Sequence, residues 1–129
     1  MPSARRLSAP MRDEILAALS GFEPAVIYLF GSFAGGDIRP DSDIDIAFLP
    51  GKPSDPLACF ETANRLADAL GREVDLVDLS RASTVLAKEV LRTGVALQVA
   101  DETRRAEFEM LALSDYARLN EERKPVLAR

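Results

Sequence analysis

Residues 29–50 read LFGSFAGGDIRPDSDIDIAFLP, and this stretch decides the expected fold and chemistry. An apolar run ends at Gly31 and Ser32, a turn-rich segment follows, and a second apolar run carries Asp43 and Asp45. In a β-strand, residues i and i+2 lie on the same face, with Cα atoms about 6.5–7 Å apart. Two carboxylates so placed repel each other and are costly to bury. The pattern therefore predicts that the carboxylates of Asp43 and Asp45 bind a cation.

Mg²⁺ fits this carboxylate pair, because it prefers oxygen ligands and keeps waters and phosphate oxygens in the rest of its shell. Two such ions can hold the attacking and leaving oxygens of an in-line phosphoryl displacement. A third carboxylate would complete the site, and the sequence VDLVDL at 74–79 offers Asp75 and Asp78. These two lie on opposite faces of a strand, because they are three residues apart, so only one of them can join.

The Gly-Ser corner supplies the groups that a phosphate needs. Gly31 lets the backbone approach a phosphate closely, and the Ser32 hydroxyl and nearby N–H groups can donate to its oxygens. A Gly-Ser pair alone occurs in many turns. A strand, Gly-Ser, ten residues and then Asp-x-Asp in the next strand form a far more specific combination.

The composition excludes several other chemistries. The chain has 129 residues, enough for one domain, and contains no histidine. Ser-His and Cys-His nucleophile pairs and His-ligated zinc are therefore unavailable. The net charge of −5 and the scattered arginines weigh against direct nucleic-acid binding. No apolar run approaches the roughly 20 residues of a membrane span, and Cys59 is the single cysteine, so a cytoplasmic protein is expected.

The spacing of apolar and turn residues predicts an α+β fold, with a small mixed sheet flanked by helices. Residues 10–123 are expected to form the domain, between an N-terminal tail at 1–9 and a C-terminal tail at 124–129. Residues 32–36 are expected to form a corner or the start of a short helix. The predicted helices are 11–19, 57–70, 83–91 and 101–121, and the predicted strands are 26–30, 43–49, 74–79 and 95–99.

The last predicted helix has an apolar face broader than docking on its own core requires. One stripe contains Phe108, Leu111, Ala112, Tyr116 and Leu119, and a second contains Met110, Leu113 and Ala117. Two interpretations remain open. The face either packs entirely within the domain or leaves part of itself for a protein partner.

The sequence GSFAGGDIRPDSDIDIAFLP resembles the GSx10DxD signature of the polymerase β-type nucleotidyltransferases. Ten residues separate Gly31-Ser32 from Asp43-Ile44-Asp45. The segments GREVDLVDLS and VLAKEVLRTGVALQVAD are similar to those of the minimal nucleotidyltransferases (MNT), the antitoxins of HEPN/MNT toxin–antitoxin pairs. The similarity runs from about residue 11 to residue 116.

The resemblance implies a polymerase β-like fold and a role for each matched residue. Asp43, Asp45 and Asp75 would be the catalytic metal ligands, holding two Mg²⁺ ions, and Asp75 would assist deprotonation of the incoming hydroxyl. Gly31 and Ser32 would hold the triphosphate of ATP.

The implied reaction transfers AMP from ATP to a hydroxyl of a cognate HEPN-domain toxin, a tyrosine by resemblance, and releases pyrophosphate. The modification would silence the toxin's ribonuclease activity, as in a type VII-like toxin–antitoxin pair. The chain is short for a separate acceptor-recognition domain, so the acceptor is expected to come from this partner protein.

One position departs from the family pattern. Members often carry a basic residue at the fifth place of GSxARG, where this chain has Gly35. Arg39, in the same loop, is the candidate nucleotide-binding cation that could replace it. This departure leaves two alternatives open: an antitoxin that neutralises its toxin by binding and occlusion alone, and a nucleotidyltransferase that modifies a small molecule.

Overall fold

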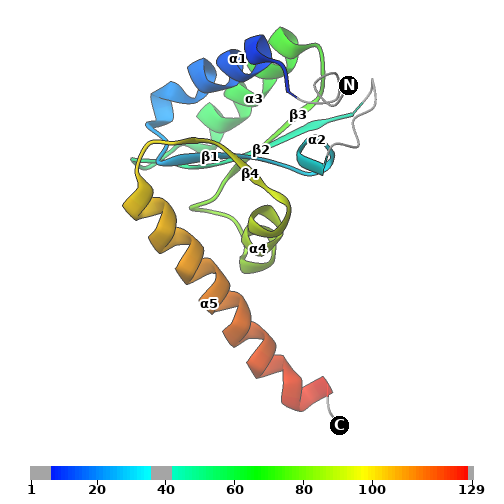
Figure 1. Ribbon diagram of the computed structural model, residues 1–129, viewed down its shortest axis with the longest axis vertical. Coiled ribbons are helices and arrows are strands. Elements are labelled where there is room, and N and C mark those ends of the chain that lie inside the picture. Colours follow the sequence, from blue (N-terminus) through cyan, green and yellow to red (C-terminus); the bar gives the residue numbers. More distant parts are fainter. Residues whose placement is uncertain (1–6, 36–41, 128–129) are drawn as a thin grey trace.

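A four-stranded mixed sheet organises the chain in the computed structural model, which describes residues 7–35 and 42–127 (Figure 1). The strand order is β3-β2-β1-β4. β1 pairs antiparallel with β2 and with β4, whereas β2 and β3 run parallel. The predicted mixed sheet is therefore confirmed. The strands are β1 (Val26–Phe30), β2 (Ile44–Leu49), β3 (Val74–Asp78) and β4 (Val95–Val99).

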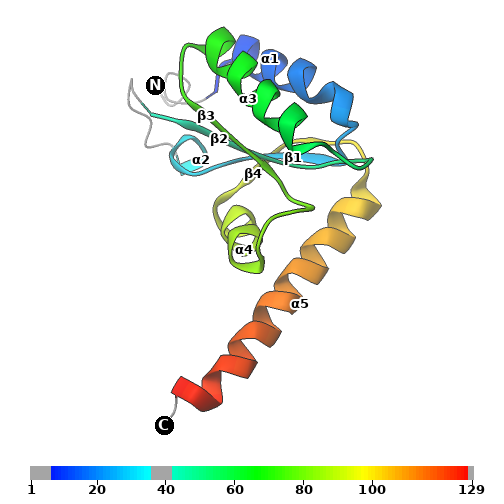
Figure 2. The same cartoon turned by 180° about the vertical axis from the view of Figure 1, so that it is seen from behind.

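Helices cover both faces of the sheet (Figures 1 and 2). One face carries α1 and α3, and the other carries α4 and α5. Three helices begin at side-chain caps, because Ser8, Asp55 and Ser83 each accept a hydrogen bond from a backbone N–H in the first turn. The helices are α1 (Ala9–Leu19), the 3₁₀ turn η2 (Ser20–Phe22), α2 (Ser32–Gly35), α3 (Pro56–Leu70), α4 (Thr84–Thr93) and α5 (Glu102–Leu127).

Alternation along β2 divides the core into two clusters. Ile44, Ile46 and Phe48 are fully buried against α1 and α3. Ala47 and Leu49 belong to the cluster on the other face, which includes Val90 of α4 and β1 side chains. Because Asp45 shares its strand face with Ala47, its carboxylate lies on the α4 side of the sheet.

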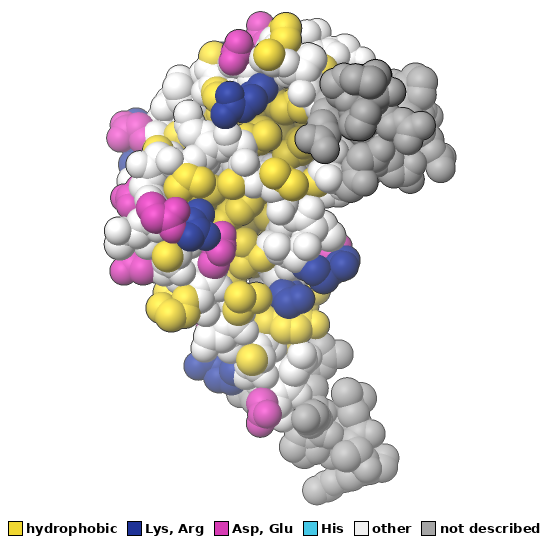
Figure 3. Space-filling view, in the orientation of Figure 1, with side chains coloured by type: hydrophobic (Ala, Val, Ile, Leu, Met, Phe, Trp, Pro, Cys, Tyr) yellow, Lys and Arg dark blue, Asp and Glu magenta, His cyan; other side chains and the backbone are white. Residues whose placement is uncertain are grey.

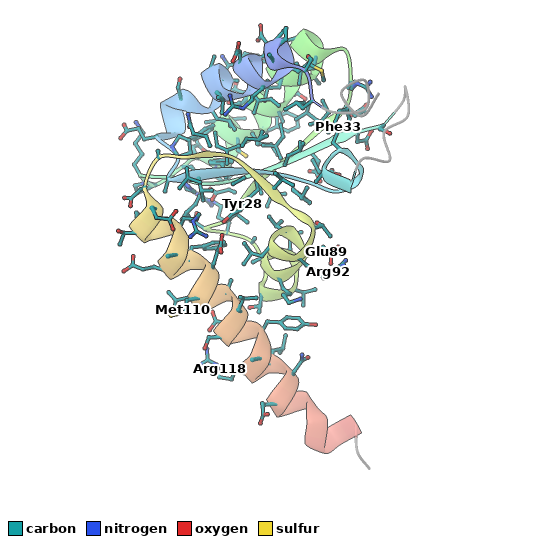
Figure 4. The ribbon with its side chains drawn as sticks, in the orientation of Figure 1. Tyr28, Phe33, Glu89, Arg92, Met110 and Arg118 are labelled. Carbon is teal, nitrogen blue, oxygen red and sulfur yellow. The ribbon has the colours of Figure 1, made fainter. Side chains whose placement is uncertain are left out.

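α5 is tied to the sheet by a partly buried polar contact (Figure 4). The Tyr28 hydroxyl, on β1, donates to Glu109 Oε2 at 2.5 Å, and Arg105 Nη1 lies 2.7 Å from the same oxygen. Burial and the bond to Glu109 raise the pKa of Tyr28, so the phenol stays protonated. The contact fixes the start of α5 against the sheet.

Beyond this contact α5 extends past α4 and away from the sheet (Figure 1). Its backbone continues through Leu127, whereas the sequence predicted an end near residue 121 and a tail from residue 124. Pro125 removes one N–H donor without ending the helix here. No helix within the described residues is long and apolar enough to cross a membrane.

The apolar face of α5 is only partly used for packing. Phe108 and Ala112 pack toward the sheet and α4. Met110, Leu111 and Leu113 are 66%, 61% and 47% exposed, and hydrophobic side chains recur along α5 and where it meets α4 (Figure 3). The interpretation that the whole face packs within the domain is therefore wrong for these three residues.

Candidate active site

Three aspartates lie together where β2 and β3 run side by side. Asp45 is half-buried in β2 and is the direct register partner of Asp75 in the parallel strand β3. Asp43 lies just before β2 and is exposed, as is Asp75. Val77 packs into the core on the α4 side, so Asp75, two residues earlier, lies on that same face. The pairing of β2 with β3 thus brings together the three predicted carboxylates.

The pKa of Asp45 reflects how close the three carboxylates lie to one another. Burial raises the pKa of Asp45 above its ordinary value, and the negative charges of Asp75 and Asp43 raise it further. A cation bound among the three carboxylates would reverse this repulsion. Asp45 is therefore held in an environment that favours either a proton or a metal.

The donor set fits Mg²⁺, since all three side chains supply oxygens and two of them are exposed enough to change rotamer. Within residues 7–35 and 42–127, no group of three acidic, cysteine or histidine side chains already has the arrangement to hold an ion. Carboxylates that repel one another turn apart until a cation draws them together. The backbone positions of the three aspartates, rather than their rotamers, define this site.

The raised pKa of Asp45 predicts a pH dependence for the metal-free protein. A group whose pKa is higher in the folded state contributes stability below its unfolded pKa, and this contribution is lost as the pH rises through the folded pKa. The ordinary pKa of an aspartate side chain is about 3.8, so the loss begins above that pH. We expect the free energy of unfolding in EDTA to fall with pH there in wild type relative to Asp45→Asn. Denaturation at a series of pH values measures it, and parallel curves would contradict the assignment.

Gly31 brings the backbone into contact with this cluster. It has φ +73°, and a Cβ atom built on it would lie 2.2 Å from Asp45 Oδ2. Glycine is therefore required at position 31 for two reasons: the backbone is left-handed, and a Cβ atom would collide with Asp45. The sequence predicted a close approach of the Gly31 backbone to a phosphate, which stays a prediction, because the contact that the structure shows is with Asp45.

The structure says less about the other two predicted phosphate-binding residues, Ser32 and Arg39. Ser32 begins α2 directly after Gly31, and Gly35 ends that helix. The predicted role of the Ser32 hydroxyl stays a prediction. Arg39, the candidate replacement for the missing cation at Gly35, lies outside the described residues.

Asp78 does not join the carboxylate cluster. It is 8% exposed and accepts hydrogen bonds from the Ser54 hydroxyl and from the backbone N–H and hydroxyl of Ser80. Burial alone would raise the pKa of Asp78, but these bonds and the charge of Arg81 outweigh it and lower the pKa. Asp78 is thus a structural carboxylate that ties β3 to the segment before α3. Of the two alternatives that the sequence left open, the geometry favours Asp75.

Residues 13–103 match the family model described as polymerase beta, nucleotidyltransferase. This match covers more than half of the chain and includes every predicted site residue. The chain belongs to this family. It is also 43% identical over 105 residues to the protein adenylyltransferase MntA of Shewanella oneidensis, across 79% of this chain and 73% of that protein.

Solved structures of MNT antitoxins share the fold of this nucleotidyltransferase. A toxin–antitoxin structure with AMP-PNP superposes with a TM-score of 0.81 and 38% identity, covering 91% of this chain and 95% of that one. The structure of tri-AMPylated Shewanella oneidensis HEPN toxin in complex with MNT antitoxin gives a TM-score of 0.77 and 35% identity, covering 92% and 94%. The expected polymerase β-like fold is confirmed.

Arg72 contacts the signature segment of this nucleotidyltransferase, although no sequence pattern points to it. Its guanidinium carbon lies 5.0 Å from the centroid of the Phe33 ring, and its Nη1 donates to the Ser42 carbonyl at 3.1 Å (Figure 4 labels Phe33). Phe33 follows the Gly-Ser corner and Ser42 precedes Asp43. Arg72 therefore holds the two ends of the signature at one place. Only the contact between distant segments reveals it, since a lone arginine after Gly71 carries no local signal.

We expect Arg72→Ala to lower the rate of AMP transfer by about 10–100-fold, because the two ends of the signature would lose their common anchor. The initial rate with labelled ATP measures this effect. Arg65→Ala is the matched control, since Arg65 is an exposed α3 arginine whose side chain donates to Thr62 of its own helix. Equal rates for the two variants would contradict the positioning role of Arg72.

Proposed function

We propose that this chain is a Mg²⁺-dependent protein adenylyltransferase that transfers AMP from ATP to a tyrosine hydroxyl of a partner HEPN-domain toxin, and so acts as its antitoxin. The observation that carries the proposal is the register of Asp45 with Asp75 beside Gly31, in a chain that resembles MntA over most of its length. We further propose a cytoplasmic location, because the proposed reaction consumes ATP.

In the proposed reaction, the acceptor oxygen attacks the α-phosphorus of ATP. The bond between this phosphorus and the oxygen bridging to the β-phosphate breaks, and pyrophosphate leaves. Asp75, the exposed member of the in-register pair, takes the hydroxyl proton. Bound Mg²⁺ would offset the negative charge on the α-phosphate and on the leaving pyrophosphate.

The remaining site residues position the reactants. Asp43 and Asp45 present their carboxylates from one end of β2, and the backbone of Gly31 leaves the room that Asp45 needs. Ser32 would donate to phosphate oxygens at the start of α2. This alignment supplies a large part of the acceleration, because phosphoryl transfer depends chiefly on positioning and charge stabilisation.

The test of this proposal separates modification from occlusion. The HEPN toxin of Shewanella oneidensis is incubated with the chain, ATP and Mg²⁺, the two proteins are separated under denaturing conditions, and the refolded toxin is assayed for ribonuclease activity. Modification predicts that the toxin stays inactive after separation, whereas a control without ATP recovers. Recovery in both samples would favour occlusion and contradict the proposal.

A further inference from the structure

A groove follows the outer edge of β3 and leads to the candidate active site. Its volume is about 610 Å³, and it is lined by β3 together with residues of α3 and residues at the start of α4. Asp75 lies in its lining, so the groove and the carboxylate cluster share a residue. Figure 2 shows β3 from this side, with α3 on one side of the strand and α4 on the other.

β3 is an edge strand whose outer backbone groups face this groove. Among the described strands, its neighbour in the sheet is β2 alone. The Ile44 N–H donates to the Glu73 carbonyl at 3.0 Å, and the Leu79 N–H donates to the Phe48 carbonyl at 2.9 Å. Backbone groups alternate in direction along a strand, so those of Val74 and Leu76 point away from β2. The Cys59 thiol of α3 donates to the Leu76 carbonyl oxygen over 3.7 Å, which confirms that this carbonyl points outward.

The groove has an apolar wall and an acidic end. Phe60 of α3 lines it and is 63% exposed, an uncommon position for a large aromatic side chain. Glu73 and Asp75 have no ion pair among the described residues, whereas Arg81, in the same lining, lies 3.4 Å from Asp78. A molecule bound in the groove would therefore face the negative charges of Glu73 and Asp75, at the end of the groove nearest the carboxylate cluster.

We infer that the outer edge of β3 binds the acceptor segment of the partner protein as an added strand. Main-chain hydrogen bonds to the outer groups of Val74 and to the Leu76 N–H would hold the segment, and Phe60 would cover one of its apolar side chains. Its tyrosine hydroxyl would reach Asp75, and basic residues beside it would meet Glu73. The inference rests on the proposed function and specifies how its substrate is presented: as an extended segment of about four to five residues.

Hydrogen exchange tests this strand addition directly. Amide exchange is followed for the chain alone, with AMP-PNP and Mg²⁺, and with the Shewanella oneidensis HEPN toxin. We expect the toxin to slow exchange of the Leu76 amide at least tenfold and to leave β4, at the opposite edge of the sheet, unchanged. Protection by AMP-PNP alone would mean that the nucleotide fills the groove, and the absence of protection by the toxin would mean that the edge is unused. Either result overturns the inference.

Comparing the KM for the toxin with the KM for ATP gives an independent test. Phe60→Asp should raise the KM for the toxin at least tenfold without changing the KM for ATP or the thermal midpoint, because Phe60 is mostly exposed. Phe60→Leu should restore the KM, and Val99→Asp, at the opposite edge, should have no effect. An unchanged KM for the toxin, or a raised KM for ATP, would contradict the groove assignment.

The mass of the toxin in the same samples keeps the two proposals apart. Wild-type AMP transfer without protection of β3 rejects the groove assignment alone. Absence of transfer by wild type rejects the proposed function, and the exchange of the Leu76 amide then decides whether the edge binds the toxin.

Discussion

Replacing Asp45 with Asn is expected to abolish AMP transfer while making the metal-free protein harder to unfold. The two effects share one cause. Asp45 is half-buried beside Asp75 and Asp43, and burial together with their charges raises its pKa. Asn removes that repulsion, which stabilises the fold, and removes a metal ligand, which we expect to lower the rate at least about 10³-fold. Opposite changes in stability and activity are typical of a functional site.

The Asp45→Asn prediction is measured by transfer of labelled AMP and by the thermal midpoint in EDTA at neutral pH. We expect the midpoint to rise by a few degrees. Asp13→Asn is the control, because Asp13 is an exposed aspartate of α1, far along the chain from the cluster. A variant that kept its activity, or that became easier to unfold, would show that Asp45 is not a strained ligand carboxylate.

Replacing Gly31 with Ala is expected to cost both stability and nearly all activity. The left-handed backbone at φ +73° costs an alanine about 1–2 kcal/mol. In addition, the new Cβ would lie 2.2 Å from Asp45 Oδ2, so the carboxylate must move. Displacement by about 1 Å at a reacting centre can lower the rate about 10²-fold.

Gly71 provides a matched control for Gly31. It has a similar φ of +67°, but a Cβ atom there would meet nothing within 4 Å. We expect Gly71→Ala to lose a similar free energy of unfolding while transferring AMP at the wild-type rate. Comparable losses of activity in both variants would mean that Gly31 acts through backbone strain rather than through its contact with Asp45.

Local signals were sufficient for most secondary structure. The strands at 26–30 and 95–99 were predicted with their observed bounds, because β-prone runs lie between turn residues. Alternation also predicted that Ile44, Ile46 and Phe48 share one face and that Asp43, Asp45 and Ala47 share the other. These inferences need only neighbours along the chain.

Contacts between segments that are distant in the sequence could not be predicted from the pattern of apolar and turn residues. The strand pattern offered both Asp75 and Asp78 as the third carboxylate, and only the resemblance to the minimal nucleotidyltransferases singled out Asp75. The parallel register of β2 with β3 distinguishes them, since Asp75 aligns with Asp45 whereas Asp78 is buried among Ser54 and Ser80. The Arg72 contacts were missed for the same physical reason, because side-chain pairing across the fold leaves no periodic signal in the sequence.

The most direct measurement of the central claim is the intact mass of the HEPN toxin after incubation with ATP and Mg²⁺. Wild type is compared with the double variant Asp43→Asn/Asp45→Asn at equal concentration. We predict one or more AMP additions with wild type and none with the variant, while both still bind the toxin. AMP additions of equal extent in both samples, or no addition in either with full neutralisation of the toxin, would contradict catalysis by the carboxylate cluster.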